Sequence, residues 1–383
     1  MRRTLKFTFL ASVLLLVLAP GAALLTRNIP MKPFADFGSL GLFGQTISAK
    51  APAFDAASIF AGRTQTDLSA WLAERMGRPR EFFIRLNNSL EFLIGRTANP
   101  NVLVGKNHEL YTAEMIRDFC IPPKSTAFAG EMAQGLKRAQ DYLAKKGKAF
   151  VFVVSPNKAA IDPTNVPSYC RPVTGDRGYN VLMAALARSG VHHVDTEALA
   201  RRSRASGAPL WFGQYGQHWN DVGQFYAVQD ILEKIRSQRN SGTATLRIDR
   251  SWIDNRPLGD EADTGLLANF LIPLRPVSPH LQISLTDDTV SIKPLIVGTS
   301  FSGGLLVPML KVKLTSEVVL HNYFKWVFRY TSATAPAVAS SLDATDDLPA
   351  TLERVDTVIV EVNASALDAP HVFQFIKAMD RLR

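Results

Sequence analysis

The segment Leu295-Ile296-Val297-Gly298-Thr299-Ser300-Phe301-Ser302 decides the fold. It begins with consecutive aliphatic residues, which are typical of a strand buried on both faces of a sheet. Gly298 predicts a tight turn, and Gly303-Gly304 mark the expected start of a helix. A strand that turns directly into a helix raises the hydroxyl of Ser300 above the sheet edge, where a base can reach it. The segment therefore makes Ser300 a candidate nucleophile, although it is not the G-x-S-x-G elbow and a helix-capping role is the plainer alternative.

Outward from this segment, apolar strands alternate with helical patterns along most of the chain. The alternation predicts a mostly parallel, three-layer α/β sheet. Strands are expected at 150–154, 191–194, 289–297, 318–320 and 357–363, and helices at 129–147, 176–189, 221–236 and from about 303. Functional groups gather at the carboxyl ends of such strands, and both Ser300 and Asn157 follow one. The stretch 332–350, rich in Ser, Thr, Ala, Pro and Asp, is expected to be a surface loop.

The second informative segment is Gln217-His218-Trp219-Asn220-Asp221-Val222-Gly223. His218 supplies a candidate base, and Asn220 and Asp221 are residue types that commonly open a helix. A histidine beside a tryptophan is also frequently a packed structural residue. A serine and a histidine that are distant in sequence but close in the fold are the minimum needed for acyl transfer.

Composition narrows the classes of partner. The 383 residues carry a formal net charge of +9 and are 46% hydrophobic, which is ample for a core. The positive charge favours anionic surroundings such as lipid headgroups or an acidic polysaccharide, or is simply a solvated basic surface. Nucleic-acid-binding motifs are absent from the sequence. No cofactor is expected. No metal site is expected either, because the two cysteines have no nearby histidine pair.

The N-terminus predicts export. Arg2, Arg3 and Lys6 precede an apolar run over about 7–25, which fits a cleaved signal peptide or an uncleaved membrane anchor equally well. We therefore divide the chain into a signal or anchor segment at 1–28, a linker at 29–62 and a domain at 63–383. The domain begins with a helical lead-in at 63–98, broken by Gly77-Arg78-Pro79. In an oxidising compartment Cys120 and Cys170 form one disulfide or remain two buried thiols.

Four segments in order resemble a known family. They are Asn101–Tyr111, Val153-Val154-Ser155-Pro156-Asn157-Lys158, His218-Trp219-Asn220 with Gly223, and Gly298-Thr299-Ser300-Phe301-Ser302. Together they are similar to the SGNH-hydrolase-like alginate O-acetyltransferase family, the AlgJ/AlgX type, over about residues 60–365. The resemblance implies a periplasmic protein that acetylates an exopolysaccharide and works beside a membrane-bound O-acyltransferase. It also implies Ser300 as nucleophile and His218 as general base.

Two positions depart from the family pattern. Where the family holds its triad aspartate, two residues before the histidine, this chain has Gly216, and Thr299 replaces the aspartate before the serine. Loss of an orienting carboxylate costs roughly four orders of magnitude in rate in well-studied triads. Asp221, Asp195 or a backbone carbonyl is expected to replace it, or a Ser–His dyad works slowly. The alternative function is a catalytically degenerate polysaccharide-binding or assembly subunit of an acetylation or export complex.

Overall fold

The computed structural model divides the chain into two compact units, which we describe separately. One comprises residues 1–99 and 265–273, and the other 100–264 and 274–383. The structure describes residues 49–75, 78–173, 175, 177–239, 245–255, 261–271, 274–286, 291–333 and 338–383, together with Phe7, Leu10, Ala11, Leu14, Leu42 and Phe43. Most of the expected signal or anchor segment thus lies outside the described residues. Among those described, no helix combines the length and apolar character needed to span a bilayer.

The described part of the first unit contains the helices α3 (Ala56–Phe60), α4 (Arg63–Arg75) and α5 (Arg78–Leu93). The predicted break at Gly77 falls on residues outside the described part of the chain, and α5 begins directly after it at Arg78. Helix α5 is tied to the segment 265–273 of the same unit. Asn88 Nδ2 donates to the Ala268 carbonyl at 2.7 Å, and the Leu271 N–H donates to Ser89 Oγ at 2.8 Å.

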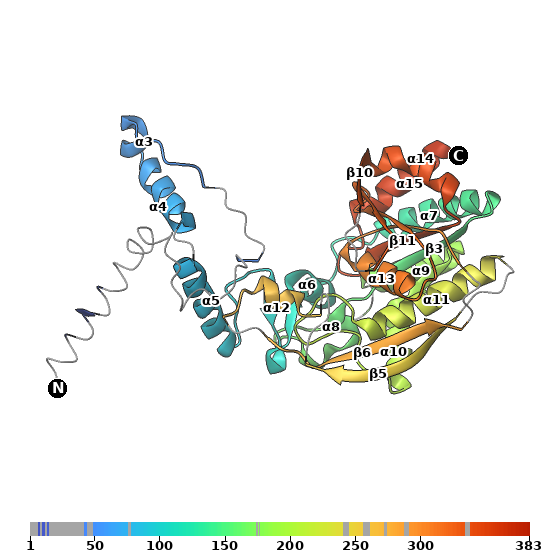
Figure 1. The fold of residues 1–383 in the computed structure, drawn as a ribbon, viewed down its shortest axis with the longest axis horizontal. Helices are drawn as coiled ribbons and strands as arrows, with labels where there is room; N and C mark the ends of the chain where they lie inside the picture. The colour runs from blue at the N-terminus through green and yellow to red at the C-terminus, as the bar shows by residue number, and fades with distance from the viewer. Residues whose placement is uncertain are drawn as a thin grey trace. The chain divides into compact units, whose positions relative to one another are not determined.

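The second unit contains a seven-stranded sheet in the order β10-β9-β8-β7-β11-β3-β4, of which Figure 1 labels β3, β10 and β11. The strands β4, β3, β11, β7 and β8 are mutually parallel, and β9 and β10 continue the sheet antiparallel. Their bounds are β3 Ala149–Ser155, β4 His193–Asp195, β7 Pro294–Gly298, β8 Val318–Asn322, β9 Trp326–Tyr330, β10 Val338–Asp343 and β11 Thr357–Asn363. The central strands β3, β7 and β11 are buried along their whole length, which explains their unbroken apolar runs.

Helices cover both faces of this sheet, so the predicted three-layer α/β architecture is confirmed. Alternate residues of β3 enter different cores: Phe150 and Phe152 join one cluster, and Val151 and Val153 join the other. The first cluster includes α7, α9, α14 and α15, and the second includes α11 and α13. Helix bounds are α6 Ala113–Cys120, α7 Phe128–Lys145, α8 Lys158–Ile161, α9 Gly178–Ser189, α10 Thr196–Ala205, α11 Asp221–Arg239, α12 Asp263–Leu267, α13 Gly303–Lys311, α14 Ala344–Arg354 and α15 Pro370–Leu382.

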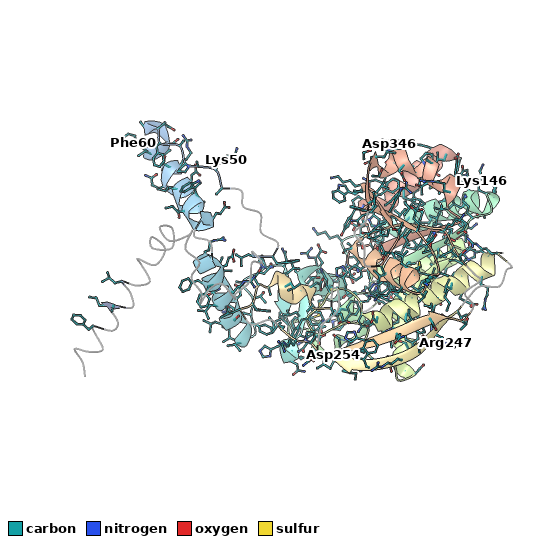
Figure 2. All side chains as sticks on the ribbon, in the orientation of Figure 1. Lys50, Phe60, Lys146, Arg247, Asp254 and Asp346 are labelled. Carbon is teal, nitrogen blue, oxygen red and sulfur yellow. A yellow bond between two sulfur atoms is a disulfide. The ribbon has the colours of Figure 1, made fainter. Side chains whose placement is uncertain are left out.

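Two short sheets lie outside the central one. Strands β1 (Val102–Val104) and β2 (Leu110–Thr112) form an antiparallel pair, as do β5 (Leu246–Asp254) and β6 (Ser278–Leu285). Figure 2 labels Arg247 and Asp254 near the two ends of β5. Most side chains of β5 are exposed, so this strand lacks the apolar alternation by which strands are recognised in sequence.

The prediction of a surface loop over 332–350 is wrong. Strand β10 and helix α14 occupy most of this stretch. Asp343 caps α14 by accepting from the Thr345 N–H at 2.8 Å, and Leu348 and Leu352 of the helix are buried. The composition misled because one cap residue and two buried leucines separated by four positions determine the helix, and because Asp347, one of the polar residues that suggested a loop, is itself buried on it.

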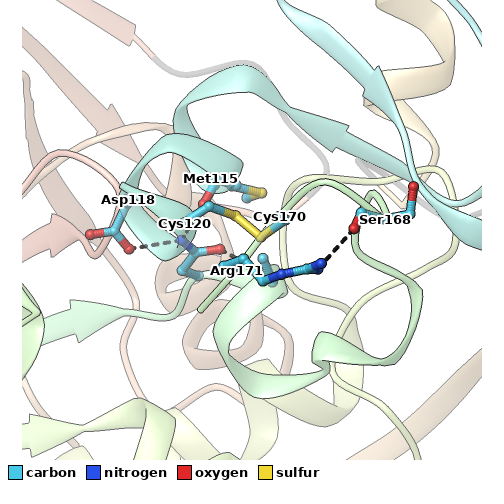
Figure 3. The surroundings of a disulfide bond; sticks show 8 residues. Met115, Asp118, Cys120, Ser168, Cys170 and Arg171 are labelled. Atoms are coloured by element: carbon cyan, nitrogen blue, oxygen red, sulfur yellow. Dashed lines mark hydrogen bonds between the residues drawn. A yellow bond between two sulfur atoms is a disulfide. The ribbon is translucent and has the colours of Figure 1, made fainter. Parts of the chain in front are cut away.

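A disulfide joins Cys120 and Cys170 (Figure 3). Their Cα atoms are 5.3 Å apart and fifty positions separate them in sequence. The bond ties the last residue of α6 to the loop before α9, where Arg171 Nη1 donates to the Ser168 carbonyl at 3.0 Å. It therefore fixes the end of a helix whose other residues line the cavity described below.

Candidate active site

Ser300 lies directly after the buried strand β7, as the sequence predicted. The strand ends at Gly298, Thr299 is extended, and Ser300 opens a single 3-10 turn (η3, Ser300–Ser302) that leads into α13. Thr299 Oγ1 accepts from the Phe301 N–H at 3.2 Å and so caps this turn. The turn is therefore held by Thr299, which leaves the Ser300 side chain exposed at the carboxyl edge of the sheet.

Two glycines permit the close packing around this turn. A Cβ atom at Gly298 would lie 2.2 Å from Ser302 Oγ, and one at Gly304 would lie 1.9 Å from Trp219 Nε1. The absence of a side chain at Gly304 lets the indole of Trp219 pack against the first turn of α13. Trp219 Nε1 donates to the Phe301 carbonyl at 3.3 Å, which fixes the residue after His218 against the residue after Ser300.

His218 lies immediately before α11, and the start of that helix is fixed by Asn220. The Asn220 Oδ1 atom accepts from the N–H groups of Val222 and Gly223 at 3.0 and 3.3 Å, so the predicted helix start is confirmed. The imidazole packs on Phe301, with ring centroids 4.4 Å apart. Backbone capping and ring packing together determine where the imidazole lies.

His218, Ser300 and Asp263 form a continuous chain of hydrogen bonds. His218 Nε2 lies 2.8 Å from Ser300 Oγ, although the two residues are 82 positions apart. On the other side of the ring, His218 Nδ1 lies 2.8 Å from Asp263 Oδ2. A carboxylate at Nδ1 accepts a hydrogen bond from the Nδ1–H group and keeps the proton on that nitrogen, which leaves Nε2 unprotonated and able to accept the serine proton. This is the geometry of a Ser-His-Asp triad.

Asp263 was not among the residues proposed from the sequence to replace the missing aspartate. It is the first residue of α12, and its Oδ1 accepts from the N–H groups of Gln217 and Thr264 at 2.8 and 2.9 Å. The carboxylate is thus held by the residue directly before His218. The expected alternatives are wrong, because Asp195 caps α10 and Asp221 contacts the Leu281 N–H.

Gly216 stands at the position of the family's aspartate and offers only backbone groups. The backbone around it is held by the buried Lys158. Lys158 Nζ is 3.3 Å from the Gly216 carbonyl and 2.8 Å from that of Gly213, and it pairs with Glu109 Oε1 at 3.0 Å. Burial lowers the pKa of Lys158, and the Glu109 carboxylate opposes that shift. The Ser155-Pro156-Asn157-Lys158 motif therefore supports the loop that leads to His218.

A second buried carboxylate lies beneath the serine turn. Glu361 of β11 is fully buried, and its Oε2 accepts from the Thr299 N–H at 2.7 Å and from Thr299 Oγ1 at 2.9 Å. Ser302 Oγ also donates to Oε2 at 3.4 Å, and Ser155 Oγ donates to Oε1 at 2.5 Å. These four donors compensate for the loss of water around a buried carboxylate. Glu361 thereby connects the turn of β7 to β11 and β3.

Asn157 follows its strand as predicted but has a structural role. Its Oδ1 accepts from the Ala159 N–H and caps α8, and its Nδ2 donates to the Met115 carbonyl and to Asp118 at 2.8 Å each. The side chain is fully buried. In the described part of the chain no group of three or more His, Cys, Asp or Glu side chains is arranged to hold a metal ion.

A cavity of about 960 Å³ opens beside Ser300. Its lining includes Gln217, Ser300 and Phe301 from the triad region, and Tyr323 from the turn between β8 and β9. The volume is within the range of small-ligand sites. A second cavity, of about 710 Å³, shares Glu114, Ser365 and Asp368 with the first. Ser300 therefore faces a cleft that is large enough for more than one chemical group.

The sequence model of one protein family matches the chain. It is described as "SGNH hydrolase-like domain, acetyltransferase AlgX", and it covers residues 102–323, more than half of the chain. The chain belongs to this family. The match includes the segments of His218, Asp263 and Ser300, and it confirms the resemblance and the fold class drawn from the sequence. A search among curated proteins found no match.

Three solved structures are similar to this chain at low sequence identity. The O-acetyltransferase domain of Pseudomonas putida AlgJ is 19% identical, with a TM-score of 0.48 over 74% of this chain and 100% of that one. Pseudomonas aeruginosa AlgX is 12% identical, with a TM-score of 0.43 over 73% and 67% of the two chains. Bacillus cereus PatB1 is 13% identical, with a TM-score of 0.44 over 72% and 100%.

Proposed function

We propose that this chain transfers acetyl groups to hydroxyl groups of an exported polysaccharide, with Ser300 as the nucleophile. The observation that carries the proposal is the hydrogen-bonded series Ser300–His218–Asp263 at the edge of a cavity. A triad of this geometry performs acyl transfer on unrelated folds, so the inference rests on the arrangement of the side chains as well as on the family.

In the first half-reaction Ser300 Oγ attacks the carbonyl carbon of the acyl donor. The hydroxyl proton passes to His218 Nε2, which lies 2.8 Å away, and the tetrahedral oxyanion forms. Collapse of this intermediate breaks the bond to the leaving group, which takes the proton from His218. The product is an acetyl ester on Ser300, and the Asp263 carboxylate stabilises the imidazolium while it exists.

In the second half-reaction a sugar hydroxyl replaces the leaving group. The hydroxyl gives its proton to His218 Nε2 as its oxygen attacks the acetyl carbon. The ester bond to Ser300 then breaks, and the proton returns from His218 to Ser300 Oγ. Water in place of the sugar gives hydrolysis, so a simple acetyl ester reports on the same machinery.

The backbone N–H of Ser300 is the first candidate for holding the oxyanion. Among the described residues it donates no hydrogen bond to another protein group, because the first residue of a 3-10 turn has no partner within it. Gln217 lines the same cavity and offers a carboxamide donor. Two such donors directed at the developing charge would each contribute about 100-fold or more to kcat.

The proposal places the protein in the periplasm. The basic residues Arg2, Arg3 and Lys6 before the apolar run at about 7–25 support export by a signal peptide or anchoring to the inner membrane. A membrane-bound O-acyltransferase that supplies acetyl groups across the bilayer is the expected partner. The alternative of a degenerate binding or assembly subunit rests on Gly216 and Thr299 together, and Asp263 supports catalysis because it supplies His218 with the carboxylate that Gly216 lacks.

Hydrolysis of a chromogenic acetyl ester by the full chain tests the proposal. We expect wild-type protein to release the chromophore, and Ser300→Ala to lose at least about 1,000-fold in kcat/KM. The adjacent Ser302→Ala is the matched control, because Ser302 Oγ is buried against Glu361 and does not contact His218. Equal rates in wild type and Ser300→Ala would contradict catalysis by this serine.

A further inference from the structure

The charge of the cavity beside Ser300 is opposite in sign to that of the whole chain. The chain carries a formal net charge of +9, but the cavity is lined by three carboxylates, Glu114, Asp343 and Asp368, and by one lysine, Lys325. One ammonium group against three carboxylates leaves two negative charges uncompensated, with His371 counted as neutral. A basic protein thus presents an acidic surface to whatever occupies this cavity.

These carboxylates are free to act on a ligand. In the described part of the chain Glu114 and Asp368 form no ion pair or side-chain hydrogen bond, and both are exposed. Asp343 uses one oxygen to cap α14. The lysine lies next to an aromatic ring, with Lys325 Nζ 4.8 Å from the centroid of Trp326.

The second cavity does not reverse this sign. It shares Glu114 and Asp368 with the first and adds Arg117 and Lys124, whereas its remaining carboxylate, Asp118, is paired with Arg177 at 2.6 Å. The charges of the second cavity therefore balance. Arg117 and Lys124 line the second cavity only, so the lining of the first cavity, where an acceptor must place its hydroxyl, keeps an excess of two carboxylates over cations.

An exposed aromatic ring completes the lining. Tyr323 is 44% exposed and has a positive φ of 52°, a conformation that an aromatic residue rarely adopts. Its N–H donates to the Gly298 carbonyl at 2.7 Å, which holds it beside the serine turn, and its ring meets that of His371 edge-on. An aromatic face packs well against the C–H face of a pyranose ring, and carboxylates accept hydrogen bonds from hydroxyl and amino groups.

From these features we infer that the acceptor is a glycan without carboxylates, either uncharged or bearing free amino groups, and not a polyuronate. This inference rests on the proposed function and specifies its substrate class. A uronate residue in this cavity would face uncompensated carboxylates at short range, which costs free energy without adding any contact. A hydroxyl or ammonium group on the same sugar would instead donate to them.

Acetyl transfer by the full chain to four oligosaccharides of equal length tests the inference. The acceptors are a glucosamine oligomer, an N-acetylglucosamine oligomer, a cellulose-derived oligomer and a mannuronate oligomer, with a chromogenic acetyl ester as donor. Mass spectrometry measures acetylated product, and chromophore release is measured in the same samples. We expect the mannuronate oligomer to be the poorest acceptor at low salt, and its disadvantage to shrink as salt screens the repulsion.

Removal of the charges should remove the discrimination. In Glu114→Gln combined with Asp368→Asn, we expect the ratio of kcat/KM for the glucosamine oligomer to that for the mannuronate oligomer to fall roughly three- to tenfold. The matched control combines Glu131→Gln with Glu353→Gln. It removes the same number of charges from exposed positions that line neither cavity, and it should leave the ratio unchanged.

These measurements distinguish a failure of the inferred acceptor class from a failure of the proposed catalysis. Any of three results would overturn the inferred acceptor class. These are a mannuronate oligomer that is as good an acceptor as the others, an unchanged ratio of kcat/KM in the double variant, and hydrolysis without transfer to any acceptor. Chromophore release that is the same in wild type and Ser300→Ala would instead overturn the proposed catalysis itself.

Discussion

At the scale of single residues, the proposed mechanism requires the Asp263 carboxylate to prepare His218 as the base. It holds the proton of Nδ1 and balances the charge of the imidazolium. For Asp263→Asn we therefore expect kcat for ester hydrolysis to fall by about 10⁴-fold with the fold intact, because an amide can present its N–H to Nδ1 and impose the wrong tautomer. Steady-state kinetics with a chromogenic acetyl ester measures the loss.

The control for this substitution is Asp221→Asn. Asp221 is near in sequence to His218 and was a candidate from the sequence, but its carboxylate contacts the Leu281 N–H. We expect this variant to retain most of the wild-type rate. A rate for Asp263→Asn close to that of Asp221→Asn would show that the imidazole does not depend on Asp263.

Much of the site could be predicted from the sequence, but its third member could not. Ser300 follows a recognisable buried strand, and His218 precedes a capped helix, so both carry local signals. Asp263 lies in Asp260-Glu261-Ala262-Asp263-Thr264, which has no periodicity and no fixed spacing from His218. Its contact depends on tertiary structure, and the only hint was a group of acidic residues in an otherwise uninformative segment.

Glu361 acts on Ser300 through the turn rather than through the substrate, so it is a positioning residue. For Glu361→Ala we expect kcat to fall by about 100-fold with KM nearly unchanged, because small displacements of a nucleophile cost rates of this order. Four donors would also lose their acceptor, at about 1–3 kcal/mol for each that stays unsatisfied. Kinetics and thermal unfolding of the same preparations measure both effects.

Glu361→Gln is the conservative comparison. A glutamine oxygen can still accept from the Thr299 N–H, while its NH₂ group faces Ser155 Oγ, which can reverse its role and donate to the Val362 carbonyl. We expect this variant to recover most of the stability and rate. An equal loss of kcat in the alanine and glutamine variants, without loss of stability, would argue for a direct chemical role instead.

At the scale of elements, Lys158 connects α8 to the loop before His218. It is fully buried, and its ammonium group shares three N–H donors among four nearby backbone carbonyls and the Glu109 carboxylate. For Lys158→Met we expect a loss of about 3–5 kcal/mol in the free energy of unfolding, because Glu109 and the carbonyls lose their partner. Urea denaturation followed by circular dichroism measures it.

The surface ion pair of Lys137 with Asp141 provides the matched control. Both groups are partly exposed, so Lys137→Met should change the free energy of unfolding by less than about 1 kcal/mol. If the two methionine variants were equally stable, the buried network of Lys158 would not support this part of the fold.

Elements were predictable where burial imposed a pattern. Strands β3, β7 and β11 are buried on both faces, and their apolar runs located them correctly. Strand β5 is mostly exposed, and α14 is a short amphipathic helix. Neither segment has a hydrophobic pattern strong enough to be recognised among its polar residues. Strand β5 is placed by its pairing with β6, and α14 by the contacts of Asp347 with β8 and β9, all of which join residues distant in sequence.

At the scale of the whole molecule, one buried histidine ties stability to pH. His321 of β8 is fully buried, and its Nε2 lies 3.0 Å from Asp347 Oδ2 of α14. Burial lowers the pKa of His321 below its ordinary value, an effect that Asp347 opposes and Arg329 reinforces. At a pH below the ordinary pKa of histidine, the unfolded chain therefore binds a proton at His321 that the native state binds less readily.

Stability should consequently be full above about pH 6.5 and decline as the pH falls through the folded pKa of His321. Thermal unfolding midpoints between pH 5 and 8 measure the decline. In His321→Asn we expect a lower midpoint at pH 8 but a flatter slope below pH 6.5. A slope that matched the wild-type slope would assign the acid sensitivity to other groups.

The central claim is that Ser300, prepared by His218 and Asp263, carries the acetyl group. The most direct measurement is rapid acid quench of the full chain with a chromogenic acetyl ester, followed by peptide mass spectrometry. We expect acetylation of the peptide that contains Ser300 in wild type, its much slower formation in Asp263→Asn, and its absence in Ser300→Ala. Acetylation at the same rate in wild type and Asp263→Asn, or an acetyl group confined to peptides without Ser300, would contradict the account.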